Sequence, residues 1–298
     1  MRKPGWTAKR AKAVFLTILA GILWGTSFPA IKIGLNYVNS YLFVFLRFLL
    51  ASALMLLIMV SAKKLTFPIK QKKLILFLGV ANGAAYLLQY VGMNSASATE
   101  AALFINLSAV WVALLSPKLQ GENLGRRKIL GVLTALTGII FVTTNLDFSM
   151  LSGGHAIGDF LLIASGVIWA FFIIYNKDLV MKSDGVLQSL TWILPVTLLP
   201  MLPFVFPSAN QIAALPAQAW FAIIYTAVAC WIVPYYLWLE GLKHLSASTS
   251  TILLLSEILV ATAISYILLN EVLTVISVAG ASLIIIAIVL VSYRSDQI

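Results

Sequence analysis

The chain is organised as ten long apolar segments separated by short polar connections. Each segment has roughly 17–25 residues, the length that a helix needs to cross a bilayer. The segments lie near residues 14–35, 42–60, 74–94, 98–117, 129–145, 157–176, 187–206, 218–240, 247–269 and 272–292. Lipid offers the backbone no hydrogen-bond partners, so segments of this kind form helices. The pattern predicts an all-α integral membrane protein with ten transmembrane helices.

The second half of the chain repeats residues of the first half at a fixed distance. Pairs 145 positions apart are Gly21 and Gly166, Trp24 and Trp169, and Lys32 and Lys177. Pairs 149 positions apart are Gly92 and Gly241, Ser97 and Ser246, Glu122 and Glu271, and Gly131 and Gly280. This predicts two five-helix repeats, residues 1–146 and 147–298. Because five is odd, the second repeat enters from the opposite face, which makes the repeats inverted. Bundles of this kind usually move small solutes by opening alternately to the two sides.

Composition and charge place this bundle in a membrane. Hydrophobic residues make up 61% of the chain and charged residues 10%, against about 25% charged in a soluble domain. The net charge of +10 could indicate a nucleic-acid partner, but the basic residues occupy alternate connections only. Connections after the first, third, fifth, seventh and ninth segments contain no Lys or Arg. By the positive-inside rule both termini are cytoplasmic. We therefore expect a multi-pass protein of the cytoplasmic (inner) membrane that contacts the lipid bilayer and does not bind nucleic acid.

Two motifs carry a resemblance to a known family. Residues 21–32 (GILWGTSFPAIK) and 46–51 (LRFLLA) resemble the opening signature of the EamA family in the drug/metabolite transporter superfamily. The turns at Glu122 and Glu271, each followed by a glycine, resemble its end-of-repeat pattern. The resemblance implies an exporter of amino acids or related metabolites, with a cavity lined chiefly by segments 3, 4, 8 and 9, together with 1 and 6. Many relatives carry a proline within segments 4 and 9, but the corresponding positions here are Ser108-Ala109 and Glu257-Ile258, so the resulting kinks are expected to be absent.

Polar and aromatic stripes mark a candidate binding face. Asn82, Tyr86 and Gln89 follow the spacing of one helical face. The equivalent positions, 149 residues later, are Trp231, Tyr235 and Trp238. Facing each other, the stripes would form an amphipathic pocket with hydrogen bonds on one wall and rings on the other. The alternative for each residue singly is interhelical packing, which we also expect for Trp24 and Trp169.

Ionisable residues within the segments are further candidates, because a charge in the bilayer is costly and usually faces a cavity or a partner. Glu257 would bind a substrate amine or exchange a proton, or else join helices structurally. Asn106 is a candidate cavity residue. Lys32 and Arg47 either extend to the headgroups or make anion or gating contacts inside the bundle. Pro234 removes a helical hydrogen bond and leaves the Cys230 carbonyl as a free acceptor.

Missing motifs narrow the function. The sequence has no phosphate-binding G-x-x-x-x-G-K-[ST] loop and no His, Cys and carboxylate spacing for a metal. We expect no cofactor, no metal and no enzymatic activity. The leading hypothesis is a secondary transporter that exports small amphiphilic metabolites, most plausibly amino acids, by alternating access. One alternative is an uptake or exchange carrier for an anionic solute such as a sugar phosphate or nucleotide. A more distant one is a membrane enzyme or scaffold. Either a monomer or a homodimer fits the sequence.

Overall fold

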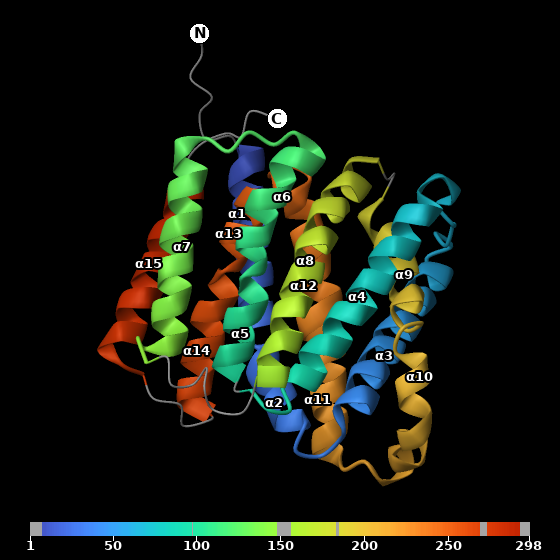
Figure 1. Ribbon diagram of the computed structural model, residues 1–298. Coiled ribbons are helices and arrows are strands. Elements are labelled where there is room, and N and C mark those ends of the chain that lie inside the picture. Colours follow the sequence, from blue (N-terminus) through green and yellow to red (C-terminus); the bar gives the residue numbers. More distant parts are fainter. Residues whose placement is uncertain (1–7, 97, 148–155, 183–184, 269–272, 293–298) are drawn as a thin grey trace.

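The computed structural model is a helical bundle in which long antiparallel helices surround a central region (Figure 1). It describes residues 8–96, 98–147, 156–182, 185–268 and 273–292. Ser97 and Glu271, two members of the repeat pattern, lie outside the described residues. Within the described ranges there are helices and no strands.

The helices of the first half are α1 (Ala8–Gly25), α2 (Ser27–Gly34), α3 (Ser40–Ser61), α4 (Lys72–Gly92), α5 (Ala98–Asn106), α6 (Ser108–Gln120) and α7 (Arg126–Thr144). Those of the second half are α8 (Ala156–Lys182), α9 (Val186–Thr197), α10 (Leu202–Val205), α11 (Ala217–Ala227), α12 (Val233–Leu242), α13 (Ala247–Leu254), α14 (Ser256–Leu268) and α15 (Val275–Ser292). A π-helical turn, η4 (Val228–Ile232), joins α11 to α12.

Nine helical stretches in the described part of the chain are long and apolar enough to cross a membrane. The tenth expected segment, 187–206, is a bent pair rather than one straight helix. The helix axis is bent by 49° between its two parts. Pro200 and Pro203 lie at this break, where the missing N–H groups interrupt the helical hydrogen bonds. Large apolar side chains such as Ile157 and Phe221 are exposed on the outside of the bundle, as expected of a surface that faces lipid.

Segments 4 and 9 are each interrupted near the middle, although neither has a proline at the interruption. The helix is interrupted at Leu107, between α5 and α6, and at Leu255, between α13 and α14. At both points the backbone makes shorter-range hydrogen bonds, with Ile258 N donating to Leu255 O at 3.0 Å. Proline is not required for such a break, because a local 3-10 turn also interrupts the α-helical ladder.

A glycine of a neighbouring helix packs against the chain beside each break. A Cβ atom on Gly21 would lie 2.9 Å from Leu254 O, and one on Gly166 would lie 3.1 Å from Ile105 O. The two contacts are equivalent. The glycines are 145 positions apart and the residues that they contact are 149 apart, and these are the two offsets that relate the halves of the sequence. The same holds for Gly92 against Gly158 and for Gly241 against Ala13. Small residues let helix backbones approach closely in a membrane, where hydrophobic burial supplies no attraction between helices.

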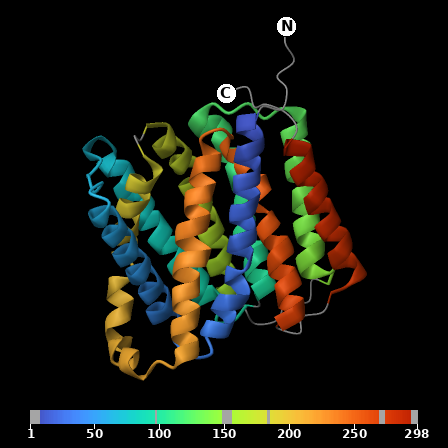
Figure 2. The same ribbon diagram turned by 180° about the vertical axis from the view of Figure 1, so that it is seen from behind.

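The beginning of α1 and the end of α15 lie at the same end of the bundle (Figures 1 and 2). Arg10 joins them by donating from Nη2 to Val291 O at 3.2 Å and from Nε to Ser292 O at 3.3 Å. We call this the Arg10 end. The opposite end, where α2 ends, is called the Lys32 end.

The packing of α7 against α15 gives a first prediction. A Cβ atom on Gly280 would lie 2.6 Å from Gly138 O and 2.6 Å from Val142 N. Gly280→Ala therefore forces two backbones apart, and we expect it to destabilise the protein by about 1–3 kcal/mol. The measurement is the melting temperature of the detergent-purified protein.

Gly125→Ala is the matched control, because nothing lies within 4 Å of a Cβ atom at Gly125. An unchanged melting temperature in both variants would contradict this account of the α7–α15 contact.

Candidate functional site

A small cavity lies at the centre of the bundle, with a volume of about 70 Å³. Its lining residues are Trp24, Ser27, Phe28, Tyr86, Gln89, Ile105, Asn106, Ser108, Trp169, Phe172, Ile173, Trp238, Thr251, Leu254 and Glu257. They come from segments 1, 3, 4, 6, 8 and 9, the six that the family resemblance implied. Pockets for small molecules usually measure about 300–1,000 Å³, so the cavity is small for such a pocket in this structure.

Most of the cavity wall consists of positions that are equivalent in the two halves. Pairs 145 positions apart are Trp24 and Trp169, Ser27 and Phe172, and Phe28 and Ile173. Pairs 149 positions apart are Gln89 and Trp238, Ile105 and Leu254, and Ser108 and Glu257. Equivalent positions therefore meet at this cavity, and the change in polarity is largest in the pairs Ser27 and Phe172, Gln89 and Trp238, and Ser108 and Glu257.

The cavity is amphipathic. Glu257 is the one charged side chain among its lining residues, and Asn106 Nδ2 donates to Glu257 Oε1 at 2.5 Å. Aromatic rings form a continuous chain along the rest of the wall. Trp24 meets Trp238 at 5.8 Å between ring centroids, and Trp238 meets Phe172 at 6.2 Å. Phe172 in turn meets Trp169 at 5.0 Å, and Trp169 meets Tyr86 at 4.8 Å.

The structure brings five of the eight expected binding residues to this cavity, namely Tyr86, Gln89, Asn106, Trp238 and Glu257. The other three lie outside its lining and make interhelical contacts. Asn82 Nδ2 donates to Thr197 Oγ1 at 3.0 Å. Tyr235 donates to Asn176 Oδ1 at 2.6 Å, and Trp231 meets the Phe48 ring of α3 edge-on at 5.6 Å between ring centroids. Each expected stripe therefore continues past the cavity into the packing between helices.

Sequence reasoning missed much of the cavity wall. Trp24 and Trp169 were expected in packing, and Ser27, Phe28, Ile105, Ser108, Phe172, Ile173, Thr251 and Leu254 were not singled out. The repeat offsets carried the relevant signal. Counting back 149 positions from Glu257 gives Ser108, and counting forward 145 positions from Trp24 gives Trp169.

Arg47 lies inside the bundle with none of its surface exposed, so the expectation that it extends to the headgroups is wrong. Its guanidinium donates to Thr226 O at 3.0 Å, Cys230 O at 3.0 Å and Tyr90 Oη at 2.9 Å. Its Cζ also lies 4.7 Å from the centroid of the Tyr86 ring. The Cys230 carbonyl is the acceptor that Pro234 was expected to leave free, and it lies in the π-helical turn η4. Arg47 thus binds α3 to this turn behind the cavity wall.

Lys32 and Lys177 make equivalent contacts at opposite ends of the bundle. Lys32 Nζ donates to Met93 O at 2.9 Å and Ala96 O at 2.7 Å, beyond the end of α4. Lys177 Nζ donates to Leu242 O at 2.9 Å, at the end of α12. Met93 and Leu242 are themselves 149 positions apart. A cation at a helix C-terminus interacts favourably with the partial negative charge of the last carbonyls.

Each lysine contact also lies just beyond the cavity. Lys32 follows the lining residue Phe28 by four positions, and Lys177 follows Ile173 by four. Four positions make about one helical turn. We call these the Lys32 clasp and the Lys177 clasp. Both are formed in the structure.

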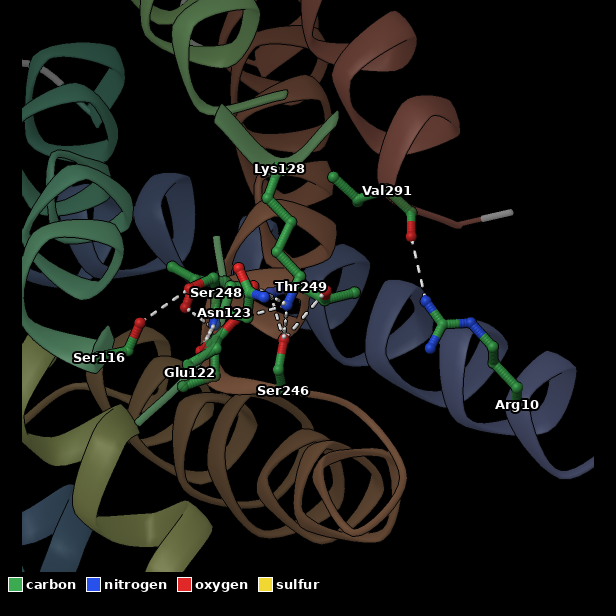
Figure 3. Close-up of polar contacts among 11 residues, drawn as sticks. Arg10, Ser116, Glu122, Asn123, Lys128, Ser246, Ser248, Thr249 and Val291 are labelled. Carbon is green, nitrogen blue, oxygen red and sulfur yellow. Dashed lines mark hydrogen bonds and ion pairs between the residues drawn. The ribbon is translucent and has the colours of Figure 1, made fainter. Parts of the chain in front are cut away.

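A second polar network joins the two halves at the Arg10 end (Figure 3). Lys128 Nζ forms an ion pair with Glu122 Oε1 at 2.8 Å and donates to Ser246 Oγ at 3.1 Å. Ser248 N donates to Glu122 Oε2 at 3.3 Å, which places a carboxylate at the N-terminus of α13. Ser116 and Ser248 hydroxyls lie 3.0 Å apart. These contacts hold the two halves of the chain together at the same end of the bundle as the Lys177 clasp.

Helical stretches of this length and apolarity, packed around a small central cavity, fit a multi-pass membrane protein, and the comparisons with known proteins show which kind it is. The sequence profile of the EamA-like transporter family matches residues 11–144 and again 156–293. The chain belongs to the EamA-like transporter family. Its relatives are named as transporters rather than enzymes.

Among these relatives is an "Uncharacterized transporter" of Archaeoglobus fulgidus, 27% identical over 88% of this chain and 90% of the relative. A Salmonella typhimurium protein named "Probable amino-acid metabolite efflux pump" is 27% identical, with 91% of each chain covered. A Streptantibioticus cattleyicolor protein named "Probable terminal-alkyne amino-acid exporter" is 24% identical over 96% of this chain and 95% of the relative. One solved crystal structure shares the fold, with a TM-score of 0.72 at 17% identity, covering 94% of this chain and 96% of that one.

The contacts of Arg47 give a second prediction. A lysine at this position cannot reach three acceptors spread over α4 and the α11–η4 region, because it lacks the planar fork of the guanidinium. Arg47→Lys leaves at least one buried acceptor unbonded, and we expect a loss of about 2 kcal/mol of stability. Thermal unfolding in detergent measures it.

Arg127→Lys, at an exposed position, is the control and should have the same melting temperature as the wild type. Equal melting temperatures for Arg47→Lys and wild type would show that the three hydrogen bonds add nothing to stability.

Proposed function

We propose that this protein is a secondary transporter that exports small amphiphilic metabolites, most plausibly amino acids, across the cytoplasmic membrane by alternating access. The observation that carries the proposal is the central cavity, because most of its wall consists of equivalent positions of two halves and a lysine clasp is formed beyond it at each end. Two relatives are named for amino-acid export, which supports the substrate class.

The proposal includes two inverted five-helix repeats, residues 1–146 and 147–298, with both termini in the cytoplasm. The glycine contacts and the lysine clasps support it, since each occurs once per half and at opposite ends of the bundle. Basic residues of the described chain support the orientation. Lys63, Lys64, Lys72, Lys73, Lys118, Arg126, Arg127, Lys182 and Lys243 all lie in connections or helix termini at the Arg10 end. The Arg10 end is then the cytoplasmic one.

Glu257 is the proposed site for a positively charged amine. It is buried, its hydrogen-bond partner in the described chain is the neutral amide of Asn106, and no basic residue lines the cavity. A carboxylate of this kind, inside a membrane protein and facing a cavity, marks a place where a solute cation can compensate the charge. The aromatic chain beside it would hold the apolar part of an amino acid.

The same geometry disfavours an anionic substrate. Lys32 and Arg47, the residues that would contact an anion, lie outside the cavity lining, and each donates to backbone carbonyls. A sugar phosphate would instead meet the Glu257 carboxyl, without a basic residue in the lining to offset it.

The two clasps are the proposed gates. Opening toward the outside requires the Lys32 clasp to break, and opening toward the cytoplasm requires the Lys177 clasp to break together with the Glu122–Lys128 network. With both clasps formed, the structure corresponds to an occluded state. In a two-state carrier, weakening one clasp shifts the population toward the side that it closes.

Transport by the purified protein tests the role of Glu257. Glu257→Gln keeps an acceptor for Asn106 but removes the charge. We expect the apparent affinity for amino acids in proteoliposomes to fall roughly 10- to 100-fold, the value of a hydrogen bond to a charged group.

Glu240→Gln is the matched control, because Glu240 pairs with Lys243 at the Arg10 end and does not line the cavity. Equal transport by the two variants would remove Glu257 from the binding site. Absence of amino-acid transport by the wild type, with a control carrier active in the same liposomes, would overturn the proposed function.

Labelling of a cavity residue tests the gates. In a Cys230→Ser background, which removes the chain's single cysteine, Ser27→Cys places a reporter in the cavity wall. We expect Lys32→Met to raise labelling by a membrane-impermeant thiol reagent from the outside, and Lys177→Met from the cytoplasmic side, each by about tenfold, since charge-assisted hydrogen bonds are lost. Lys182→Met, near an exposed helix end, should change neither. Increased labelling from the same side in both clasp variants would contradict the assignment of the gates.

A further inference from the structure

Two buried indole N–H groups in the cavity wall have no partner. Trp24 Nε1 and Trp169 Nε1 are inaccessible to solvent and make no hydrogen bond within the part of the chain that the structure describes. Both side chains line the central cavity. An unsatisfied buried donor costs about 1–3 kcal/mol, so two of them at one cavity require a physical reason.

The contrast with another tryptophan of the same wall is informative. Trp238 also lines the cavity, and its Nε1 donates to Ser250 Oγ at 2.9 Å. The fold therefore provides a partner for one cavity indole and leaves two without. Those two are the members of a repeat pair, and they are the one pair of lining residues with the same side chain in both halves.

Both tryptophans share the cavity wall with the Asn106–Glu257 pair. Trp24 belongs to α1 and Trp169 to α8. The two donors therefore come from different helices, one in each half of the chain, that line the same cavity as Glu257.

We infer that Trp24 and Trp169 bind the carboxylate of the substrate through their indole N–H groups, while Glu257 binds its ammonium group. This inference rests on the proposed function, because it assigns the two charged groups of a transported amino acid. Two N–H donors and one carboxylate complement a zwitterion, whose opposite charges are adjacent. The pairing of equivalent donors also suits a carrier, since each half supplies one contact to the same group whichever side the cavity faces. An amine without a carboxylate would use Glu257 alone.

Ligand-induced thermal stabilisation tests the inference, since a ligand of the folded form raises the melting temperature according to its concentration and dissociation constant. The probes are L-phenylalanine, L-phenylalaninamide and 2-phenylethylamine, which share a ring and an ammonium group but differ at the carboxylate. We expect wild type to bind phenylalanine most tightly. Trp24→Phe and Trp169→Phe should each lower the affinity for phenylalanine by about tenfold. The affinity for 2-phenylethylamine should stay within about twofold of the wild-type value.

Trp111→Phe, at a partly exposed position outside the cavity, is the matched control and should bind all three probes as the wild type does. If a phenylalanine variant does not fold, 3-benzothienylalanine at position 24 or 169 keeps the bicyclic shape and replaces the N–H by sulfur. Unchanged phenylalanine affinity in the folded variants, or an equal loss for 2-phenylethylamine, overturns the inference. Wild type that responds to none of the probes, nor to L-leucine, instead contradicts the proposed function.

Discussion

A bilayer offers no partner to a buried polar group, and the interior of this protein is arranged around that constraint. Arg47 is buried without a carboxylate partner in the described chain, and backbone carbonyls and a tyrosine hydroxyl satisfy it. The lysines of the clasps likewise donate to carbonyls at helix ends. Because almost every such group is matched, the unmatched ones carry information. Two of them line the central cavity beside Glu257, where a solute can supply what the protein does not.

Close backbone contact is the second element of the architecture. Gly21, Gly166, Gly92 and Gly241 each bring a helix against a neighbouring backbone, and each contact has its equivalent in the other half. The duplicated sequence thus produces duplicated contacts between helices. At the cavity the two halves differ, because Gln89 occupies the position equivalent to Trp238 and Ser108 the position equivalent to Glu257. Similar packing in the two halves therefore surrounds a cavity whose two walls differ in chemistry.

The positions of the membrane-length helical stretches were predictable from the sequence, because the need to span lipid with satisfied backbone leaves a strong hydropathy signal. The bend between α9 and α10 was not predicted, although Pro200 and Pro203 indicate it. The breaks at Leu107 and Leu255 have no proline, so composition alone does not reveal them.

The candidate site was predicted in part. Glu257, Asn106, Tyr86, Gln89 and Trp238 were found because polar or aromatic side chains in lipid-length helices are conspicuous. Helical spacing alone could not say where a stripe leaves the cavity, so Asn82, Trp231 and Tyr235 were included with it. The contacts of Arg47 were not predicted, since two of its partners are backbone carbonyls 179 and 183 positions away, and such acceptors have no sequence signature.

Counterflow is the most direct test of a carrier that exposes one cavity to each side in turn. Proteoliposomes are loaded with unlabelled L-phenylalanine and diluted into a trace of the labelled amino acid. An alternating-access carrier exchanges the two, so labelled phenylalanine should accumulate transiently above its external concentration. Uptake that never exceeds equilibration, or that matches protein-free liposomes, would contradict the account.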